Sequence, residues 1–128
     1  MSIDNNLYEK SIKILTDLIA FKTISGQENS NLIDYCEKIL NHIGIDTFKV
    51  YDDDKKRVNL FGTLKAKNQS TKKPIILSGH TDVVPVSKGW SSDPFIATIK
   101  NDKLYGRGSC DMKGFIAVSY THLRAHET

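Results

Sequence analysis

The stretch that decides the fold is LSGHTDV at residues 77–83, in which an apolar run ends in small residues and then presents His80 and Asp82. The run begins as PIILS at residues 74–78, after two lysines and before a glycine. This pattern predicts a short buried strand. In open α/β sheets, ligands bind beyond the carboxyl ends of strands, which is where His80 and Asp82 fall. The histidine can ligate a metal there, and the aspartate can orient its ring or join the ligands.

A second segment, LYGRGSCDMKGF at residues 104–115, carries another candidate metal ligand. Its glycines let the backbone turn sharply and bring Asp111 to the start of a predicted helix. A carboxylate in this position can bridge two cations, and hydrolases with paired metals hold the ions about 3.5–4 Å apart. Taken alone, Asp111 also fits a helix N-cap and the glycines fit an ordinary loop.

Three motifs occur in a specific order: SGHTDVVP at 78–85, W-x-x-DPF at 90–95 and LYGRG-x-x-DMKG at 104–114. Together they resemble the amino-terminal part of the dizinc aminoacylase and carboxypeptidase family, of the M20 type. The resemblance covers residues 7–117, the front third of such an enzyme. It implies a truncated α/β fold, the first part of an α/β/α catalytic domain with a mixed sheet.

The resemblance also implies roles for individual residues. His80 matches a ligand to one zinc ion, and Asp111 matches the carboxylate that bridges two zinc ions. Asp82 matches the catalytic aspartate that hydrogen-bonds the ligand histidine and fixes its tautomer. The family holds the peptide bond after the bridging aspartate in cis, here Asp111–Met112. Two further motif positions are assigned structural roles only: Arg107 and Lys113.

The cofactors implied by the resemblance are two zinc ions, with cobalt as an alternative metal. The implied reaction is hydrolysis of a small-molecule N-acyl amino acid. The family's Glu-Glu general base, its remaining ligands, and its lid and dimerisation domain match no residue here, and the full-length enzyme is expected to be a homodimer. Because two protein ligands cannot hold two zinc ions that need about four donors each, we expect these residues to be inactive alone.

Several alternatives stay open. The motif GRGSCDMKGFIA at 106–117 is most similar to the branch of the family that removes acetyl from N-acetylornithine in arginine biosynthesis. The alternative is the branch that desuccinylates N-succinyl-diaminopimelate, or another dizinc N-acyl-amino-acid hydrolase. A different class would be a stand-alone metal-binding or interaction domain without catalysis.

Composition restricts the partners and the compartment. The chain has 128 residues and a net charge of +3, with lysines and acidic residues interspersed. There is no basic stripe, so nucleic-acid binding is not expected. No apolar stretch approaches the ~20 residues of a membrane span, and the first residues lack a signal-peptide pattern. Cys36 and Cys110 lie far apart without metal-type spacing, which favours a reducing cytoplasm.

The last eleven residues, VSYTHLRAHET at 118–128, differ from the rest in composition. His122 and His126 are four residues apart and precede Glu127, a spacing that on a helix favours a zinc pair. We reject that interpretation because the segment matches the in-frame translation of a transposase-type sequencing-library adapter. The chain is therefore expected to divide into a partial catalytic domain, 1–117, and a non-native tail.

Hydrophobic periodicity predicts three helices. Residues 5–21 form an amphipathic pattern. The S-x-x-E sequence at 25–28 has the form of a capping box and predicts the start of a second helix, with Cys36 in its core face and Gly44 as its C′ stop. A third helix is expected from residue 112.

Alternating patterns predict strands at 45–51 and 58–64, paired as a hairpin. A second hairpin is expected between 96–99 and 103–105. Residues 84–95 lack periodicity and predict a loop, expected to be anchored by two aromatic side chains: Trp90 and Phe95.

Overall fold

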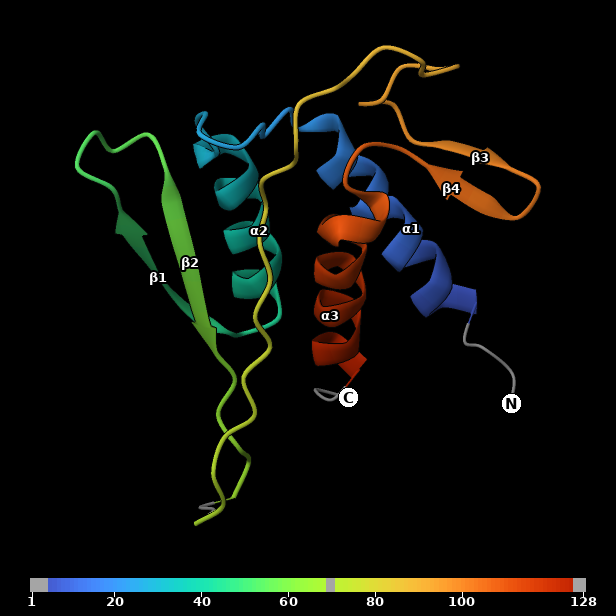
Figure 1. Ribbon diagram of the computed structural model, residues 1–128. Helices are drawn as coiled ribbons and strands as arrows, with labels where there is room; N and C mark the ends of the chain where they lie inside the picture. Colours follow the sequence, from blue (N-terminus) through green and yellow to red (C-terminus); the bar gives the residue numbers. More distant parts are fainter. Residues whose placement is uncertain (1–4, 69–70, 126–128) are drawn as a thin grey trace.

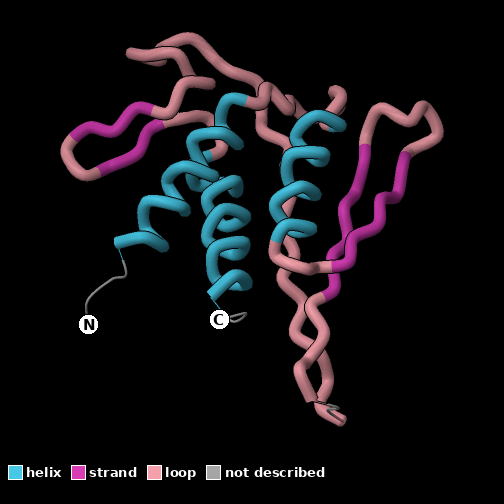
Figure 2. The backbone as a smooth tube through the Cα atoms, turned by 180° about the vertical axis from the view of Figure 1, so that it is seen from behind, coloured by secondary structure: helices cyan, strands magenta, loops and turns pink. Residues whose placement is uncertain are grey.

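The computed structural model describes residues 5–68 and 71–125, and three helices lie between two β-hairpins (Figures 1 and 2). The fold class is α/β, as predicted. In chain order the elements are α1 (Asn5–Ala20), α2 (Ser30–His42), β1 (Asp46–Tyr51), β2 (Val58–Thr63), β3 (Thr98–Lys100), β4 (Lys103–Tyr105), a π-helical turn η1 (Ser109–Lys113) and α3 (Gly114–Ala125). Among the described residues, no helix combines the length and apolar character needed to cross a membrane.

Helix α2 begins later than the predicted capping box. It starts at Ser30, with Asn29 at the N-cap but without a side-chain cap bond. The amide of Asn29 instead donates to the carbonyl of Val58 at 3.0 Å and accepts from the Val58 N–H at 2.8 Å. The capping-box prediction is therefore wrong, because Asn29 ties the helix start to β2. The predicted stop is confirmed, since Gly44 has a φ of 76° and its N–H bonds Asn41.

The core lies where α1, α2, β2 and α3 meet. Cys36 is 1% exposed, which confirms its predicted core position. Burial raises the pKa of its thiol to about 11, so it stays a protonated, unreactive side chain. The buried members of this cluster are Leu18, Leu32, Ile33, Cys36, Val58, Ile116 and Ala117.

Both predicted hairpins are present. Strands β1 and β2 pair in antiparallel register from Asp46↔Thr63 to Tyr51↔Val58. Strands β3 and β4 pair through a two-residue turn in which Asn101 and Asp102 both have positive φ, at 52° and 56°. This is the backbone of a type I′ turn, whose twist matches that of paired strands.

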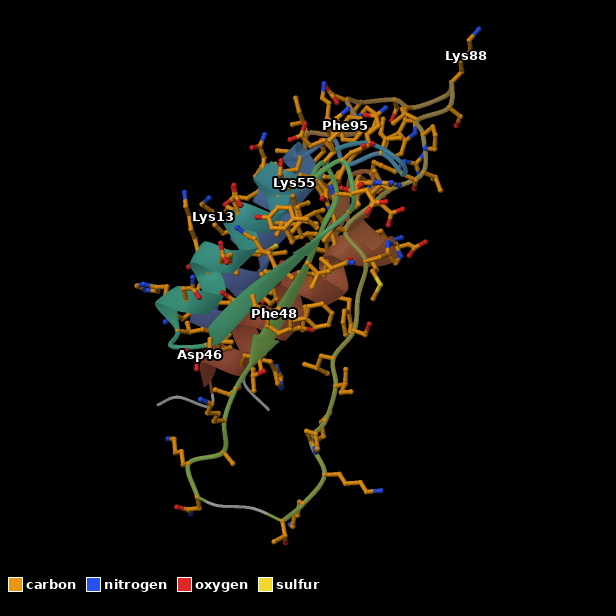
Figure 3. The ribbon with its side chains drawn as sticks, turned by 90° about the vertical axis from the view of Figure 1, so that its left-hand side faces the viewer. Lys13, Asp46, Phe48, Lys55, Lys88 and Phe95 are labelled. Carbon is orange, nitrogen blue, oxygen red and sulfur yellow. The ribbon has the colours of Figure 1, made fainter. Side chains whose placement is uncertain are left out.

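The predicted buried strand at residues 74–78 is wrong. These residues are extended but pair with no described strand, and Ile75 and Ile76 are 90% and 83% exposed. Residues 64–68 and the first part of 71–79 extend past the ends of the helices as the two sides of an open loop (Figure 3), and the segment returns to α3 at Gly79. An apolar run is buried only where other strands and a covering layer flank it, and no described segment does so here.

Pairing occurs instead a few residues later. Ile24 and Val83 form a parallel bridge, and Val83 is 2% exposed. The sheet elements of the described chain are therefore two antiparallel hairpins and this one parallel contact.

Helix α3 continues through residues 118–125. Thr121 is buried, and its hydroxyl lies 2.8 Å from that of Ser11 on α1. His122 lies on this helix, while His126 and Glu127 lie outside the described residues. The predicted domain boundary at Ala117 thus stays a prediction.

Candidate metal centre

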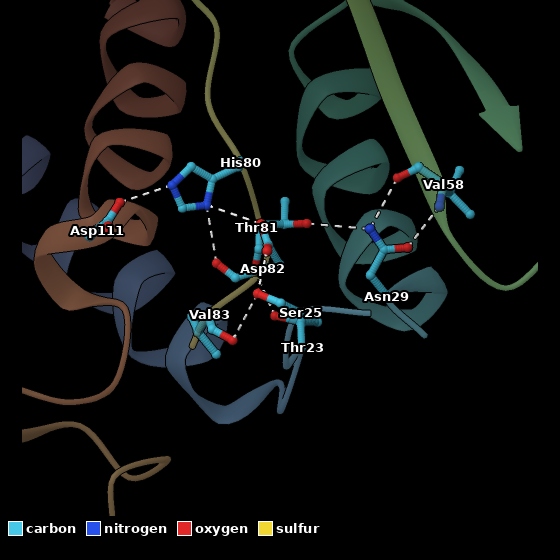
Figure 4. Close-up of polar contacts among 9 residues, drawn as sticks. All are labelled: Thr23, Ser25, Asn29, Val58, His80, Thr81, Asp82, Val83 and Asp111. Carbon is cyan, nitrogen blue, oxygen red and sulfur yellow. Dashed lines mark hydrogen bonds and ion pairs between the residues drawn. The ribbon is translucent and has the colours of Figure 1, made fainter. Parts of the chain in front are cut away.

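The structure brings together two side chains that are 31 residues apart in the chain. The Nε2 atom of His80 lies 2.9 Å from Oδ1 of Asp111 (Figure 4). His80 follows the extended segment, and Asp111 lies in η1 at the start of the α3 helix. Both side chains are accessible, at 48% and 85% of their maximum exposure. A solvent ion can therefore reach both donors.

The other nitrogen of the ring faces Asp82. His80 Nδ1 lies 3.1 Å from the main-chain oxygen of Asp82 and 3.2 Å from its Oδ1. Both oxygens are acceptors, so Nδ1 donates to Asp82; Nε2 faces the Asp111 carboxylate, and only when it carries no hydrogen is its lone pair free for a metal ion. This is the arrangement of a histidine ligand oriented by a carboxylate. Burial lowers the pKa of His80, but the hydrogen bonds and charges of Asp111 and Asp82 outweigh it, so the pKa is raised.

The second carboxylate oxygen of Asp82 accepts a hydrogen bond from Ser25. The distance from Ser25 Oγ to Asp82 Oδ2 is 2.5 Å. This bond is the main reason why the pKa of Asp82 lies below its usual value. Ser25 was absent from the predicted site, because the only sequence signal at that position was its place in a supposed capping box.

The turn that carries Asp111 has unusual backbone geometry. Gly108 precedes it with a φ of 84°, and the Asp111–Met112 peptide bond is cis, as the resemblance implies. A Cβ at Gly108 would lie 2.7 Å from Val83 Cγ1, so only glycine fits this close approach. The α3 helix begins at Gly114, and no described N–H is capped by Asp111. The N-cap alternative is therefore wrong, and the carboxylate is directed at His80.

Lys113 attaches this turn to α1. Its side chain is fully buried, and Nζ donates to the carbonyls of Leu18 at 2.8 Å and Phe21 at 2.7 Å. Its N–H bonds the carbonyl of Gly108 at 2.8 Å, which closes the turn. Burial lowers the pKa of Lys113 to about 8. The predicted structural role of Lys113 is confirmed.

Arg107 and the loop at 84–95 border the same region. The guanidinium lies 5.2 Å from the centre of the Trp90 ring, and Nη2 donates to the carbonyl of Pro85 at 3.3 Å. Phe95 contacts Lys22, whose Nζ lies 5.5 Å from the ring centre. The predicted loop and its two aromatic anchors are confirmed.

An open cavity of about 230 Å³ contains the three predicted site residues. Its lining comprises Ser25, His80, Asp82, Val83, Val84, Gly106, Arg107, Gly108, Ser109, Cys110 and Asp111. All come from three stretches of chain: the segment after α1, residues 80–84, and the glycine-rich turn.

The donors fit a zinc ion in chemistry but not in number. Imidazole nitrogen and carboxylate oxygen are common zinc ligands; donors on one tetrahedral ion lie roughly 3.4 Å from each other, so the 2.9 Å pair found here would have to open by about half an ångström to admit one. Within residues 5–68 and 71–125, no group of three or more His, Cys, Asp or Glu side chains could hold a metal ion. His80 and Asp111 therefore form one side of a site that needs further donors.

A histidine held between two aspartates, in a cavity of an α/β fold, is an arrangement compatible with a metal-dependent hydrolase. Comparison with known proteins finds similarity to members of that class. Residues 76–128 match Peptidase family M20/M25/M40. This match agrees with the family resemblance carried by the three sequence motifs.

The relatives are longer enzymes. Over 106 residues the chain is 40% identical to the acetylornithine deacetylase of Myxococcus xanthus, covering 80% of this chain and 27% of that protein. Over 81 residues it is 41% identical to the succinyl-diaminopimelate desuccinylase of Gluconobacter oxydans, covering 62% of this chain and 20% of that protein. Human carnosine dipeptidase 1 matches with a TM-score of 0.74 and 25% identity, covering 98% of this chain and 30% of that structure. The chain spans about a quarter of the length of the curated relatives.

Proposed function

We propose that this chain contributes one half of a zinc centre in an enzyme that hydrolyses N-acyl amino acids. The observation that carries the proposal is the 2.9 Å approach of His80 Nε2 to Asp111, with Asp82 on the opposite side of the ring. The M20/M25/M40 match and the names of the relatives support the same chemistry. We propose two zinc ions as cofactors, with cobalt as an alternative.

Each residue has a distinct part. His80 would donate its Nε2 lone pair to one ion, and Asp111 would supply a carboxylate oxygen to each of two ions. Asp82 accepts the Nδ1 hydrogen and keeps the ring in the orientation that ligation needs. When bound, zinc polarises a carbonyl and lowers the pKa of a water molecule. Proton transfer to the leaving amine requires a general base, which we assign to a residue outside this chain.

For the substrate we propose N-acetylornithine, with the N-succinyl-diaminopimelate reaction as the alternative. The preference rests on the motif at residues 106–117. Within it, Ser109 and Cys110 line the cavity, where they can contact a substrate. Ile116 and Ala117 are buried in the core and cannot. The near-equal identities to the two kinds of relative, 40% and 41%, favour neither substrate.

We further propose that the longer protein is a cytoplasmic homodimer acting in arginine biosynthesis. We also propose that residues 1–117 are part of its catalytic domain and residues 118–128 are foreign to it. Reading the source DNA through the codon for Ala117 tests the boundary. A frame that continues into other residues supports it, and a natural gene that encodes the printed tail contradicts it.

The metal assignment is tested in a version of the chain extended through its own reading frame to the length of the relatives. We expect His80→Ala and Asp111→Ala each to abolish amide hydrolysis and to lower the zinc content. His42→Ala is the control, because His42 ends α2 and does not line the cavity. Near-normal turnover in either site variant would overturn the assignment.

The same extended protein tests the substrate. Initial rates on N-acetylornithine and on N-succinyl-diaminopimelate should differ in kcat/KM, with the acetyl substrate faster. A higher kcat/KM for the succinyl substrate would establish the alternative.

A further inference from the structure

A hydroxyl from the segment after α1 reaches the carboxylate behind the metal-facing histidine. Ser25 Oγ lies 2.5 Å from Asp82 Oδ2 and 3.3 Å from the carbonyl oxygen of Val83 (Figure 4). A hydroxyl has one hydrogen, and the shorter contact to a charged acceptor is the stronger bond. Ser25 therefore donates to Asp82.

The backbone around Asp82 is held without help from the Ser25 side chain. The main chain of Val83 accepts from the Ser25 N–H and donates to the carbonyl of Thr23, both at 2.9 Å. The Thr23 hydroxyl donates to the carbonyl of Thr81 at 2.6 Å, and an Asn29 amide hydrogen points at the Thr81 hydroxyl at 3.3 Å. Loss of the Ser25 hydroxyl would therefore release the Asp82 carboxylate while the strand stays in place.

Release of the Asp82 carboxylate would affect the His80 ring, because the two carboxylate oxygens have different partners. Oδ2 accepts from Ser25, and Oδ1 lies 3.2 Å from His80 Nδ1. The Asp82 side chain is 51% exposed, so without a fixed donor it can rotate into solvent. Nδ1 would then keep only the main-chain oxygen of Asp82, at 3.1 Å, as its acceptor, while Nε2 still faces Asp111 at 2.9 Å.

We propose that Ser25 is a positioning residue of the metal centre, which acts through Asp82 to hold the His80 ring with Nε2 toward the ion. This inference rests on the proposed function for its consequence, zinc affinity. The chain of contacts from Ser25 through Asp82 to His80 is present without a metal ion. It joins the segment after α1 to the predicted site.

The test uses three variants of the 128-residue chain labelled with ¹⁵N. Ser25→Ala removes the hydroxyl, and Ser25→Thr retains it at an exposed position. Thr23→Val is the control for a loosened strand, because it removes a neighbouring hydroxyl that bonds the main chain of Thr81 and not a carboxylate.

Ring nitrogen shifts of His80 at alkaline pH, where the ring is neutral, report which nitrogen carries hydrogen. We expect Ser25→Ala to lower the fraction of the Nδ1–H tautomer, and Thr23→Val and Ser25→Thr to leave it as in the parent chain. Titration with zinc should then show a roughly three- to tenfold weaker affinity for Ser25→Ala. That is below the 10–100-fold typical of groups bonded directly to a ligand, because Ser25 acts one bond further away.

The outcomes separate the two proposals. An unchanged tautomer and unchanged zinc affinity in Ser25→Ala would overturn the role of Ser25, as would equal changes in Thr23→Val. If zinc leaves the His80 ring of the parent chain unshifted, the metal centre itself fails, and the metal-free tautomer comparison still decides whether Ser25 orients the ring.

Discussion

The two ends of one extended segment behave differently. Its start, the exposed arm at residues 71–79, places Ile75 and Ile76 in solvent. Its end, the anchored end at residues 81–83, is bridged to the segment after α1 and buries Val83. Apolar character alone does not bury a strand, since burial requires neighbouring elements that satisfy its main chain. Only the end that presents His80 and Asp82 has such neighbours.

The largest loss of unfolding free energy is expected from a substitution at the point where the glycine-rich turn meets the anchored end. In Gly108→Ala the new methyl would lie 2.7 Å from Val83 Cγ1, at a residue with a φ of 84°. Positive φ and overpacking together should cost roughly 2–5 kcal/mol of unfolding free energy. Gly89→Ala is the control, because it has positive φ but open space, and it should lose only about 1–2 kcal/mol. Equal losses of unfolding free energy in the two variants, measured by urea denaturation, would show that the contact with Val83 is unimportant.

Truncating an apolar side chain at each end compares the ends directly. Val83→Ala removes buried methyl groups and should lower the unfolding free energy by about 2 kcal/mol. Ile76→Ala, at an 83% exposed position, should change it by less than about 0.5 kcal/mol. If chemical denaturation gives the opposite order, the exposed arm is packed in solution and the comparison fails.

Lys113 tests the attachment of the Asp111 turn to α1. Lys113→Met keeps the volume but removes one of the donors to the carbonyls of Leu18 and Phe21, which keep the N–H groups of Phe21 and Thr23. Removing a buried charge offsets part of that loss, so we expect a net cost of about 1–2 kcal/mol. The exposed Lys13→Met, which breaks a surface pair with Asp17, should change stability by less than about 0.5 kcal/mol. A Tm for Lys113→Met equal to that of the parent would contradict the anchoring role.

The smallest change in stability is expected far from the site, in the turn between β1 and β2. Backbone and side-chain bonds from Arg57 hold the pKa of Asp52 below its usual value of 3.8. The folded state thus favours the ionised carboxyl, and its contribution is present above pH 3.8 and is lost as the pH falls through the lower folded pKa. Asp52→Asn should lower Tm slightly at neutral pH, and the difference from the parent should vanish in acid. Asp53→Asn is the control, and a pH-independent difference for Asp52→Asn would argue against the carboxylate.

Local patterns predicted the helices, both hairpins and the buried position of Cys36, because each depends on periodicity or on turn chemistry within a few residues. The meeting of His80 and Asp111 was predicted by the resemblance of three motifs and not by spacing alone. These predictions needed no knowledge of the packing.

The wrong predictions and the missed contacts have a common physical cause. Residues 74–78 have the composition of a buried strand, but their exposure depends on elements elsewhere in the chain. Asn29 bonds Val58, and Ser25 bonds Asp82, across 29 and 57 residues, and no local pattern encodes such contacts. Long-range hydrogen bonds of single polar side chains therefore had to be read from the structure.

The most direct test of the account is a zinc-edge anomalous difference map from crystals of the chain grown with zinc. We expect a peak in contact with both His80 Nε2 and the Asp111 carboxylate, with Asp82 still facing Nδ1. Zinc bound only at other side chains, or a peak on His80 without Asp111, would contradict the proposal that these two residues share a metal.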